Sequence, residues 1–209
     1  MIDQQNVKNV ILDLGGVLVD IEPSNTIEAF KRIMQPDIYE SINWEDATEA
    51  LCSMEVGKWD KSQFFGYFKK ICKPSVIEEE IIDAWNAMVL EFPHERVEMV
   101  KSLAQKYNLF LLSNTNEIHI SCFEQDFKNR YHIHLPDLFS KVFYSSEIGF
   151  RKPHAESFHY VLNHAGIIAE ETVMVDDRED NCRMAESIGM QSIKVPENSG
   201  LEAVIGELL

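Results

Sequence analysis

Short apolar runs, each followed by turn or capping residues, recur along this chain of 209 residues. Runs that are this short and this continuously apolar are typical of strands buried on both faces of a parallel sheet. Four runs are clear and one is weaker: residues 7–14, 109–114, 172–177 and 191–195, and then 141–146. The pattern therefore predicts a buried parallel sheet.

Amphipathic stretches alternate with these predicted strands. Their apolar residues recur at helical spacing, and prolines and glycines stand where helices begin and end, as at Pro93, Pro153, Gly166 and Gly189. The helices are expected over residues 94–107, 116–127, 154–165 and 180–188. Such alternation predicts an α/β fold with a Rossmann-like, doubly wound parallel sheet.

Residues 21–92 interrupt the alternation, because they contain no convincing strand and place their apolar positions on helical stripes. Helices are expected there over residues 25–34, 44–52, 61–72 and 75–90. An insertion after the first strand lies over the carboxyl end of the sheet, where open α/β sheets bind ligands. The chain is therefore predicted to have a core (residues 1–20 and 93–209) and a helical cap (residues 21–92). The tryptophans of this insert are expected in the core of the cap, with stacking on a sugar as the alternative: Trp44, Trp59 and Trp85.

The composition is acidic, with 19 Lys and Arg against 35 Asp and Glu and a net charge of −16. This charge argues against nucleic acid or an anionic membrane as the main partner. No run approaches the ~20 apolar residues of a membrane span, and the N-terminus shows no signal peptide. The cysteines form no closely spaced pair, so a reducing cytoplasm is the expected compartment: Cys52, Cys72, Cys122 and Cys182.

Polar residues follow the first two predicted strands. The first strand ends in Asp13, and Gly15 and Gly16 after it let a ligand or metal approach the backbone. The second ends in Ser113 and Asn114, just where a helix begins. A helix N-terminus offers free N–H groups to phosphate oxygens. Ordinary helix capping by Asn114 or Asn116 is the alternative, and it is compatible with phosphate binding.

A lysine and a pair of aspartates complete the set of polar residues. Lys152 precedes a proline that starts a helix, where a cation is mildly unfavourable, and this favours a role in neutralising phosphate charge. Asp176 and Asp177 end a buried strand, and adjacent carboxylates repel each other unless a cation neutralises them. Oxygen ligands without nearby Cys or His favour Mg²⁺ over zinc. The alternative is a solvated first turn of a helix.

Asp13, Ser113, Lys152 and the pair Asp176 and Asp177 occur in this order, each at or just beyond a predicted strand end. In this ordered set the chain resembles the haloacid dehalogenase superfamily of hydrolases, with a helical cap between the first and second motifs. The segments LDLGGVLVD, LSNTN, GFRKP and VDDREDN look most like the branch of bacterial α-D-glucose-1-phosphate phosphatases. The resemblance covers nearly the whole chain and implies a Mg²⁺-dependent phosphatase that acts on a small phosphate ester.

The resemblance also implies a role for each residue. Asp13 is the expected nucleophile and would form an aspartyl-phosphate. Ser113 and Asn114 are expected to hold the phosphoryl oxygens, and Lys152 to neutralise charge and orient the nucleophile. The implied Mg²⁺ ligands are Asp13, the backbone carbonyl of Gly15, Asp176 and Asp177, with Asp180 as a weaker candidate outside the metal.

Gly15 departs from the pattern of the superfamily, because most of its phosphatases carry there a second aspartate that protonates the leaving group. Three explanations are open: a leaving group that needs little help, such as an anomeric or acyl phosphate; another acid, with Asp20, Glu22 or a cap residue as candidates; or a protein that binds phosphometabolites without turnover. A haloacid dehalogenase is a further alternative, although such enzymes usually carry an aromatic residue at this position and need no metal. We therefore expect a phosphatase for a small phosphometabolite such as a sugar phosphate, as a monomer or homodimer.

Overall fold

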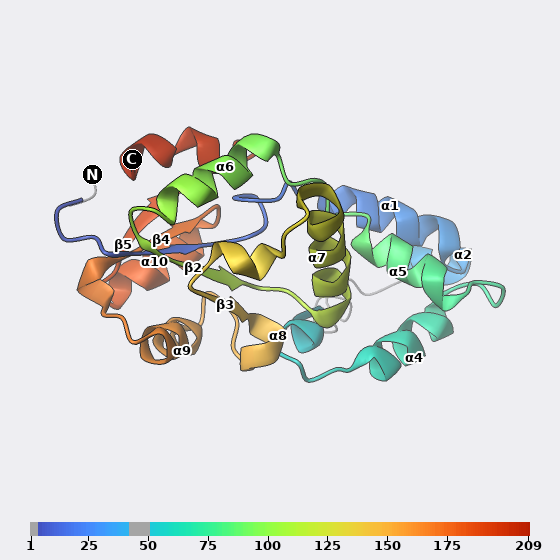
Figure 1. The fold of residues 1–209 in the computed structure, drawn as a ribbon. Helices are drawn as coiled ribbons and strands as arrows, with labels where there is room; N and C mark the ends of the chain where they lie inside the picture. The colour runs from blue at the N-terminus through green and yellow to red at the C-terminus, as the bar shows by residue number, and fades with distance from the viewer. Residues whose placement is uncertain (1–3, 42–50) are drawn as a thin grey trace.

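Parallel strands form the centre of the protein, in the order β3-β2-β1-β4-β5 (Figure 1). The computed structural model describes residues 4–41 and 51–209. The strands are β1 (Asn9–Leu12), β2 (Asn108–Ser113), β3 (Lys141–Tyr144), β4 (Thr172–Asp176) and β5 (Gln191–Lys194). Each overlaps one of the predicted apolar runs, so the predicted parallel sheet is confirmed.

Side chains along β1 alternate between the two faces of the sheet and pack into two separate cores. Val10 and Leu12 lie in one core, with α6 (His94–Leu103), α7 (Glu117–Tyr131) and the C-terminal turns. Ile11 lies in the other core, with α9 (Ala155–Ala165) and α10 (Glu179–Ser187). Figure 1 shows α6 and α9 on opposite sides of the sheet. Helices on both faces confirm the doubly wound arrangement.

Local signals explain where these helices end. Gly166 has a left-handed φ of 68° directly after α9, a conformation that glycine adopts without steric cost. The very short elements were not predicted, because they are too short to show a helical period: α8 (Ser145–Ile148) and the 3₁₀ turns η1 (Leu135–Leu138), η2 (Ala169–Glu171), η3 (Leu201–Ala203) and η4 (Ile205–Glu207). Within residues 4–41 and 51–209, no helix has the length and apolar character needed to cross a membrane.

A group of helices lies between β1 and β2 in the chain, and we call residues 23–86 the cap segment. Its helices are α1 (Pro23–Ile33), α2 (Pro36–Ser41), α4 (Lys61–Ile71) and α5 (Glu78–Asn86). Helix α2 was not predicted, and most of the predicted helix 44–52, with Trp44, lies outside the described residues. Trp85 is buried in the apolar core of this segment and Trp59 packs at its edge, as expected for core residues.

A two-stranded backbone connection joins the cap segment to the sheet. Ile21 forms an antiparallel bridge with Val89, and Glu22 N donates to Met88 O at 2.8 Å. The predicted boundaries between core and cap, at 20/21 and 92/93, lie close to this backbone connection. The division of the chain into core and cap at these points stays a prediction.

Helix α5 of the cap segment packs on the start of α7. Trp85 stacks on His119 with ring centroids 5.4 Å apart, and His119 Nδ1 lies 2.8 Å from Asn86 Oδ1. Ile118 of α7 packs into the apolar core of the cap segment. Burial lowers the pKa of His119 from 6.5 to about 4, so its ring is neutral at pH 7.

The buried His119 makes folding sensitive to acid. The unfolded chain binds a proton at this histidine below about pH 6.5, whereas the folded protein binds it only near pH 4, so stability falls as pH falls through this window. The shift corresponds to about 3 kcal/mol in the free energy of unfolding. We expect His119→Gln to remove most of this pH-dependent loss in urea unfolding between pH 6.5 and 4. His159→Gln, at an exposed site, should leave it unchanged. An unaltered pH slope in His119→Gln would contradict the assignment.

Candidate active site

The polar residues predicted at strand ends meet at one edge of the sheet. Asp13 directly follows β1, Ser113 ends β2 and Asp176 ends β4, and β1 lies between the other two strands. Asp13 N donates to Val175 O at 2.9 Å, which continues the β1–β4 pairing up to the site. Because all three strands run parallel, their carboxyl ends present these side chains to the same place.

Lys152 links two of the strand ends by charge. Its Nζ lies 2.8 Å from Asp13 Oδ1 and 2.6 Å from Asp176 Oδ2, and the whole residue is 1% exposed. Burial alone would lower the pKa of Lys152, but the two carboxylates outweigh it and hold the pKa above its ordinary value. The lysine is therefore a buried cation shared between two carboxylates.

Asn114 fixes the loop that carries Lys152. Its side-chain Nδ2 donates to Lys152 O at 2.8 Å, and Lys152 N donates to Asn114 Oδ1 at 2.8 Å. The predicted role of Asn114 was to hold phosphoryl oxygens, but its side chain is occupied by the backbone of Lys152. In this structure Asn114 positions the lysine.

The start of α7 lies directly after Ser113. Asn116 caps this helix, because its Oδ1 accepts from Ile118 N at 3.1 Å and from His119 N at 3.2 Å. The predicted helix start after Ser113 is therefore present, and of the two predicted capping residues Asn116 is the one that caps it. Ser113 itself is 3% exposed at the end of β2.

Asp13, Asp176 and Asp177 form a compact carboxylate cluster. One oxygen of each lies within 4.8 Å of the others, and no other group of this kind is found among the residues described. Burial, opposed by Lys152 and aided by repulsion from Asp176, raises the pKa of Asp13 from 3.8 to about 7. Burial and the charge of Asp176 also raise the pKa of Asp177. A divalent cation would relieve this repulsion, and hard carboxylate oxygens suit Mg²⁺.

Two residues near the cluster differ from the prediction: Asn181 was not predicted to contribute, and Asp180 pairs with an arginine side chain. Asp176 Oδ1 accepts from Asn181 Nδ2 at 2.9 Å and from Arg178 N at 2.9 Å, while Oδ2 accepts from Lys152 Nζ, so the carboxylate is oriented on both oxygens. Asn181 stands five positions after Asp176, within the first turns of α10, and this spacing is its only sequence signal. Asp180, the weaker candidate, pairs with the Arg178 side chain at 2.8 Å, which lowers its pKa.

The glycines after Asp13 allow close approach at the cluster. Gly16 has a φ of 71°, and a Cβ atom on it would lie 2.6 Å from Asp177 Oδ2. Gly15 has no such strain, and a Cβ atom there would lie 3.3 Å from Ile21 Cδ1. Gly16 is therefore required both by its backbone conformation and by the carboxylate beside it.

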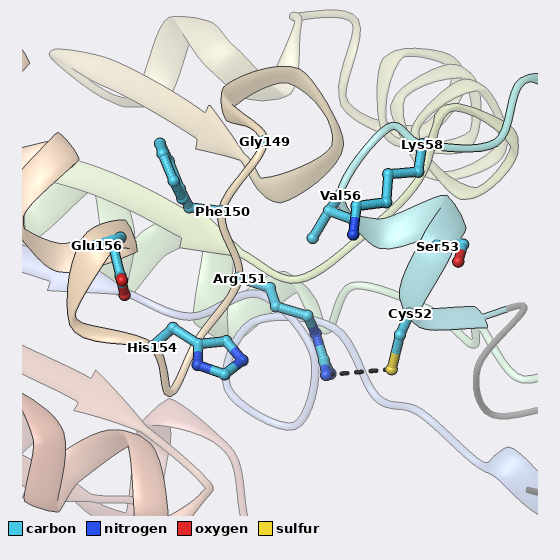
Figure 2. Close-up of a pocket in the computed structure, with 9 residues that line it drawn as sticks. All are labelled: Cys52, Ser53, Val56, Lys58, Gly149, Phe150, Arg151, His154 and Glu156. Atoms are coloured by element: carbon cyan, nitrogen blue, oxygen red, sulfur yellow. Dashed lines mark hydrogen bonds between the residues drawn. The ribbon is translucent and has the colours of Figure 1, made fainter.

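A pocket of about 480 Å³ lies next to the site, between residues 52–58 of the cap segment and residues 149–156 of the core. Figure 2 shows Arg151 extending from the core loop toward Cys52, with His154 beside it. Arg151 Nη1 donates to Cys52 Sγ at 3.2 Å, and Arg151 Nε lies 2.7 Å from Glu55 Oε2. The residue next to Lys152 therefore joins the core to the cap segment.

Comparison with known proteins agrees with this arrangement. The chain belongs to the haloacid dehalogenase-like hydrolase family, whose model matches residues 7–189. It is accordingly a hydrolase by family, and the predicted superfamily and fold are confirmed.

Individual relatives are similar along most of the chain. The D-ribitol-5-phosphate phosphatase of Bacteroides thetaiotaomicron is 28% identical over 193 residues, which cover 92% of this chain and 93% of the relative. The glyceraldehyde 3-phosphate phosphatase of Methanocaldococcus jannaschii is 27% identical, covering 90% of this chain and 85% of the relative. The relatives thus include phosphatases of small sugar phosphates.

A solved structure is similar over the same length. A haloacid dehalogenase family enzyme from Bacteroides thetaiotaomicron has a TM-score of 0.87 and 30% identity, covering 92% of this chain and 95% of that chain. A further crystal structure of that enzyme holds magnesium and inorganic phosphate, and it has a TM-score of 0.80 and 29% identity over 92% and 96% of the two chains. The placement of this protein in the α-D-glucose-1-phosphate phosphatase branch stays a prediction.

The close contact of Gly16 with Asp177 gives a direct test of the cluster. Gly16→Ala forces a left-handed backbone on alanine and drives its Cβ atom into the carboxylate, so we expect a loss of about 1–3 kcal/mol in the free energy of unfolding. Gly206→Ala is the matched control, because a Cβ atom there meets nothing within 4 Å. Urea unfolding measures both. Equal stability of the two variants would show that the turn at Gly16 is not as constrained as described.

Proposed function

We propose that this protein is a Mg²⁺-dependent phosphatase that hydrolyses a small phosphorylated metabolite of the sugar-phosphate class through an aspartyl-phosphate. The observation that carries the proposal is Lys152, buried between Asp13 and Asp176 beside Asp177. A carboxylate nucleophile candidate, a buried cation and a carboxylate cluster at one sheet edge are what phosphoryl transfer requires. The phosphatase relatives and the magnesium and phosphate complex of the similar enzyme support it.

Asp13 has to be ionised in order to attack phosphorus. Burial and the negative charge of Asp176 disfavour the ionised carboxylate of Asp13, and the positive charge of Lys152 opposes both effects. Bound Mg²⁺, held by Asp13, the Gly15 carbonyl, Asp176 and Asp177, would supply further positive charge for the nucleophile and the phosphoryl oxygens. Lys152 orients the attacking oxygen, and Ser113 with the N-terminus of α7 would receive the phosphoryl group.

The proposed setting follows from the same features. The four cysteines are free in the structure and fit a reducing cytoplasm. The substrate is a small phosphate ester, with neither nucleic acid nor membrane as a partner, and the protein acts as a monomer or homodimer. Phosphate release from a panel of sugar phosphates that includes D-ribitol 5-phosphate would identify the substrate.

Phosphate release tests the proposal. With Mg²⁺ we expect turnover of p-nitrophenyl phosphate and of some members of a sugar-phosphate panel, and EDTA should abolish it until Mg²⁺ is restored. Asp13→Asn removes the nucleophile and should lower kcat/KM by about 10⁴-fold or more. Asp137→Asn makes the same chemical change at an exposed site and should retain full activity.

Three outcomes would overturn the proposal. Turnover that persists in EDTA or in Asp13→Asn would remove the metal or the nucleophile from the mechanism. Halide release from 2-haloacids without metal would show a dehalogenase. Thermal stabilisation by phosphometabolites, with no phosphate released from any ester, would show a binding protein.

A further inference from the structure

The position at which a proton donor is expected is apolar in this protein. A Cβ atom on Gly15 would meet the side chain of Ile21 at 3.3 Å. No carboxyl group therefore stands two residues after Asp13, and the neighbouring space is filled by an aliphatic side chain. An alkoxide leaving group nevertheless needs a proton, and general acid catalysis is worth roughly 10²–10⁴-fold. The proton has to come from another part of the chain.

Two acidic residues, Asp20 and Glu22, stand where the chain passes from β1 into the cap segment, and both already have partners. Asp20 Oδ1 lies 2.7 Å from Nη1 of Arg96, which also binds Glu202, and the Asp20 side chain is 45% exposed to water, which does not favour its protonated form. Glu22 caps helix α1 by accepting from Ser24 N and Oγ, which lowers its pKa. A carboxyl group with a lowered pKa, such as Glu22, is already ionised near neutral pH and holds no proton to donate. Neither residue fits the role.

Glu55 of the cap segment lies beside the loop of the core that carries Lys152. Its side chain is 12% exposed, and Oε2 lies 2.7 Å from Nε of Arg151, the residue directly before Lys152. Neither of these two atoms makes a well-aligned hydrogen bond, so the contact is held by charge rather than by direction. The carboxyl group is thus mostly withdrawn from solvent, with Arg151 as a charged neighbour but no aligned hydrogen bond on Oε2.

A close backbone contact fixes the segment that carries Glu55. Gly57 has a φ of 67°, and a Cβ atom on it would lie 2.4 Å from Ser146 O of the core. The chain of the cap segment therefore lies directly on the core backbone two residues after Glu55. Figure 2 shows Arg151 reaching toward this same segment at Cys52. These contacts bring a cap carboxyl group to the edge of the site.

The charges that face Glu55 come from the site itself. Burial raises the pKa of Glu55 above its ordinary value, although the positive charges of Arg151, Arg178 and Lys152 each oppose this. Lys152 binds Asp13, and Arg178 follows the aspartate pair, so two of the cations that act on Glu55 stand next to the carboxylate cluster. A buried carboxyl group in this position is suited to hold a proton for a neighbouring group.

We propose that Glu55 supplies the proton to the leaving group and that Arg151 stabilises the carboxylate that remains. This proposal rests on the phosphatase function proposed above. In the first step the Asp13 oxygen bonds to phosphorus, the bond from phosphorus to the ester oxygen breaks, and the Glu55 proton goes to that oxygen, which leaves as an alcohol. In the second step the oxygen of water bonds to phosphorus, its proton goes to Glu55, and the bond from phosphorus to Asp13 breaks. One water is consumed, and alcohol and phosphate are released.

Two aryl esters that differ in their need for a proton test the proposal. The p-nitrophenolate ion leaves without protonation, whereas phenolate, derived from a much weaker acid, leaves poorly without it. In Glu55→Gln we expect kcat/KM for phenyl phosphate to fall by about 10²-fold or more, and for p-nitrophenyl phosphate by less than about 10-fold. Glu55→Asp should recover part of the loss with phenyl phosphate, because it restores an acid.

The matched control is Glu156→Gln, which makes the same change at an exposed carboxylate lining the pocket beside Arg151. It should leave both rates unchanged. A purely structural role of Glu55 in docking the cap segment would lower both rates in Glu55→Gln by the same factor, and this result, or two unchanged rates, would overturn the proposal. If the wild-type protein released no phosphate from either ester with Mg²⁺ present, the phosphatase function itself would be overturned, and this inference with it.

Discussion

The contact of Lys152 with Asp13 and Asp176 is the constraint on which the rest of the site depends. A buried charge is costly unless it is paired, and removing one partner from a buried pair costs about 3–5 kcal/mol. Lys152 Nζ lies within 2.8 Å of both carboxylates, which come from the neighbouring strands β1 and β4. The ends of both strands and the lysine loop are therefore fixed with respect to one another. Asn114 completes this arrangement by binding the backbone of Lys152 on both its N–H and its C=O.

The charge balance around Lys152 explains how an acidic protein can receive an anion. One lysine faces three aspartates, so the cluster keeps an excess of negative charge that a divalent cation can neutralise. The net charge of −16 would repel a phosphate ester at long range. The proposed Mg²⁺, Lys152 and the N-terminus of α7 would reverse the local field at one point. Within this account, part of the acidity belongs to the metal site and most of the remainder to the solvated surface.

The sequence predicted the sheet and the site to different depths. The strands were readable because buried parallel strands are continuous apolar runs, and Asp13, Lys152, Asp176 and Asp177 were readable because each stands just after such a run or just before a helix. The capping of α7 was predicted for Asn114 or Asn116, and the structure shows Asn116 in this role. Helix α2 was missed, because six residues carry too little period to separate it from a turn.

The contacts between segments that are distant in the chain could not be predicted from the sequence. Asn114 binds the backbone of Lys152, 38 positions further along the chain, and Trp85 of α5 stacks on His119 of α7. Glu55 reaches Arg151 from the cap segment, whose placement the local sequence pattern does not encode. Such pairs depend on how the cap segment docks on α7 and on the loop before α9, which is a property of tertiary packing. The sequence showed that an acid was missing at Gly15, but only the folded chain indicates which carboxyl group lies near the site.

Calorimetry of Mg²⁺ binding tests the electrostatic account most directly. Because burial and Asp176 raise the pKa of Asp13 to about 7 without metal, Mg²⁺ binding near pH 7 should displace protons from the site, and this release should vanish well above pH 7. The number of protons is obtained by titrating in buffers of different ionisation enthalpy, with Asp13→Asn in parallel. The account predicts proton release in the wild-type protein and clearly less in Asp13→Asn, where only Asp177 keeps a raised pKa. Mg²⁺ binding without proton release in the wild-type protein, or with equal release in both, would contradict it.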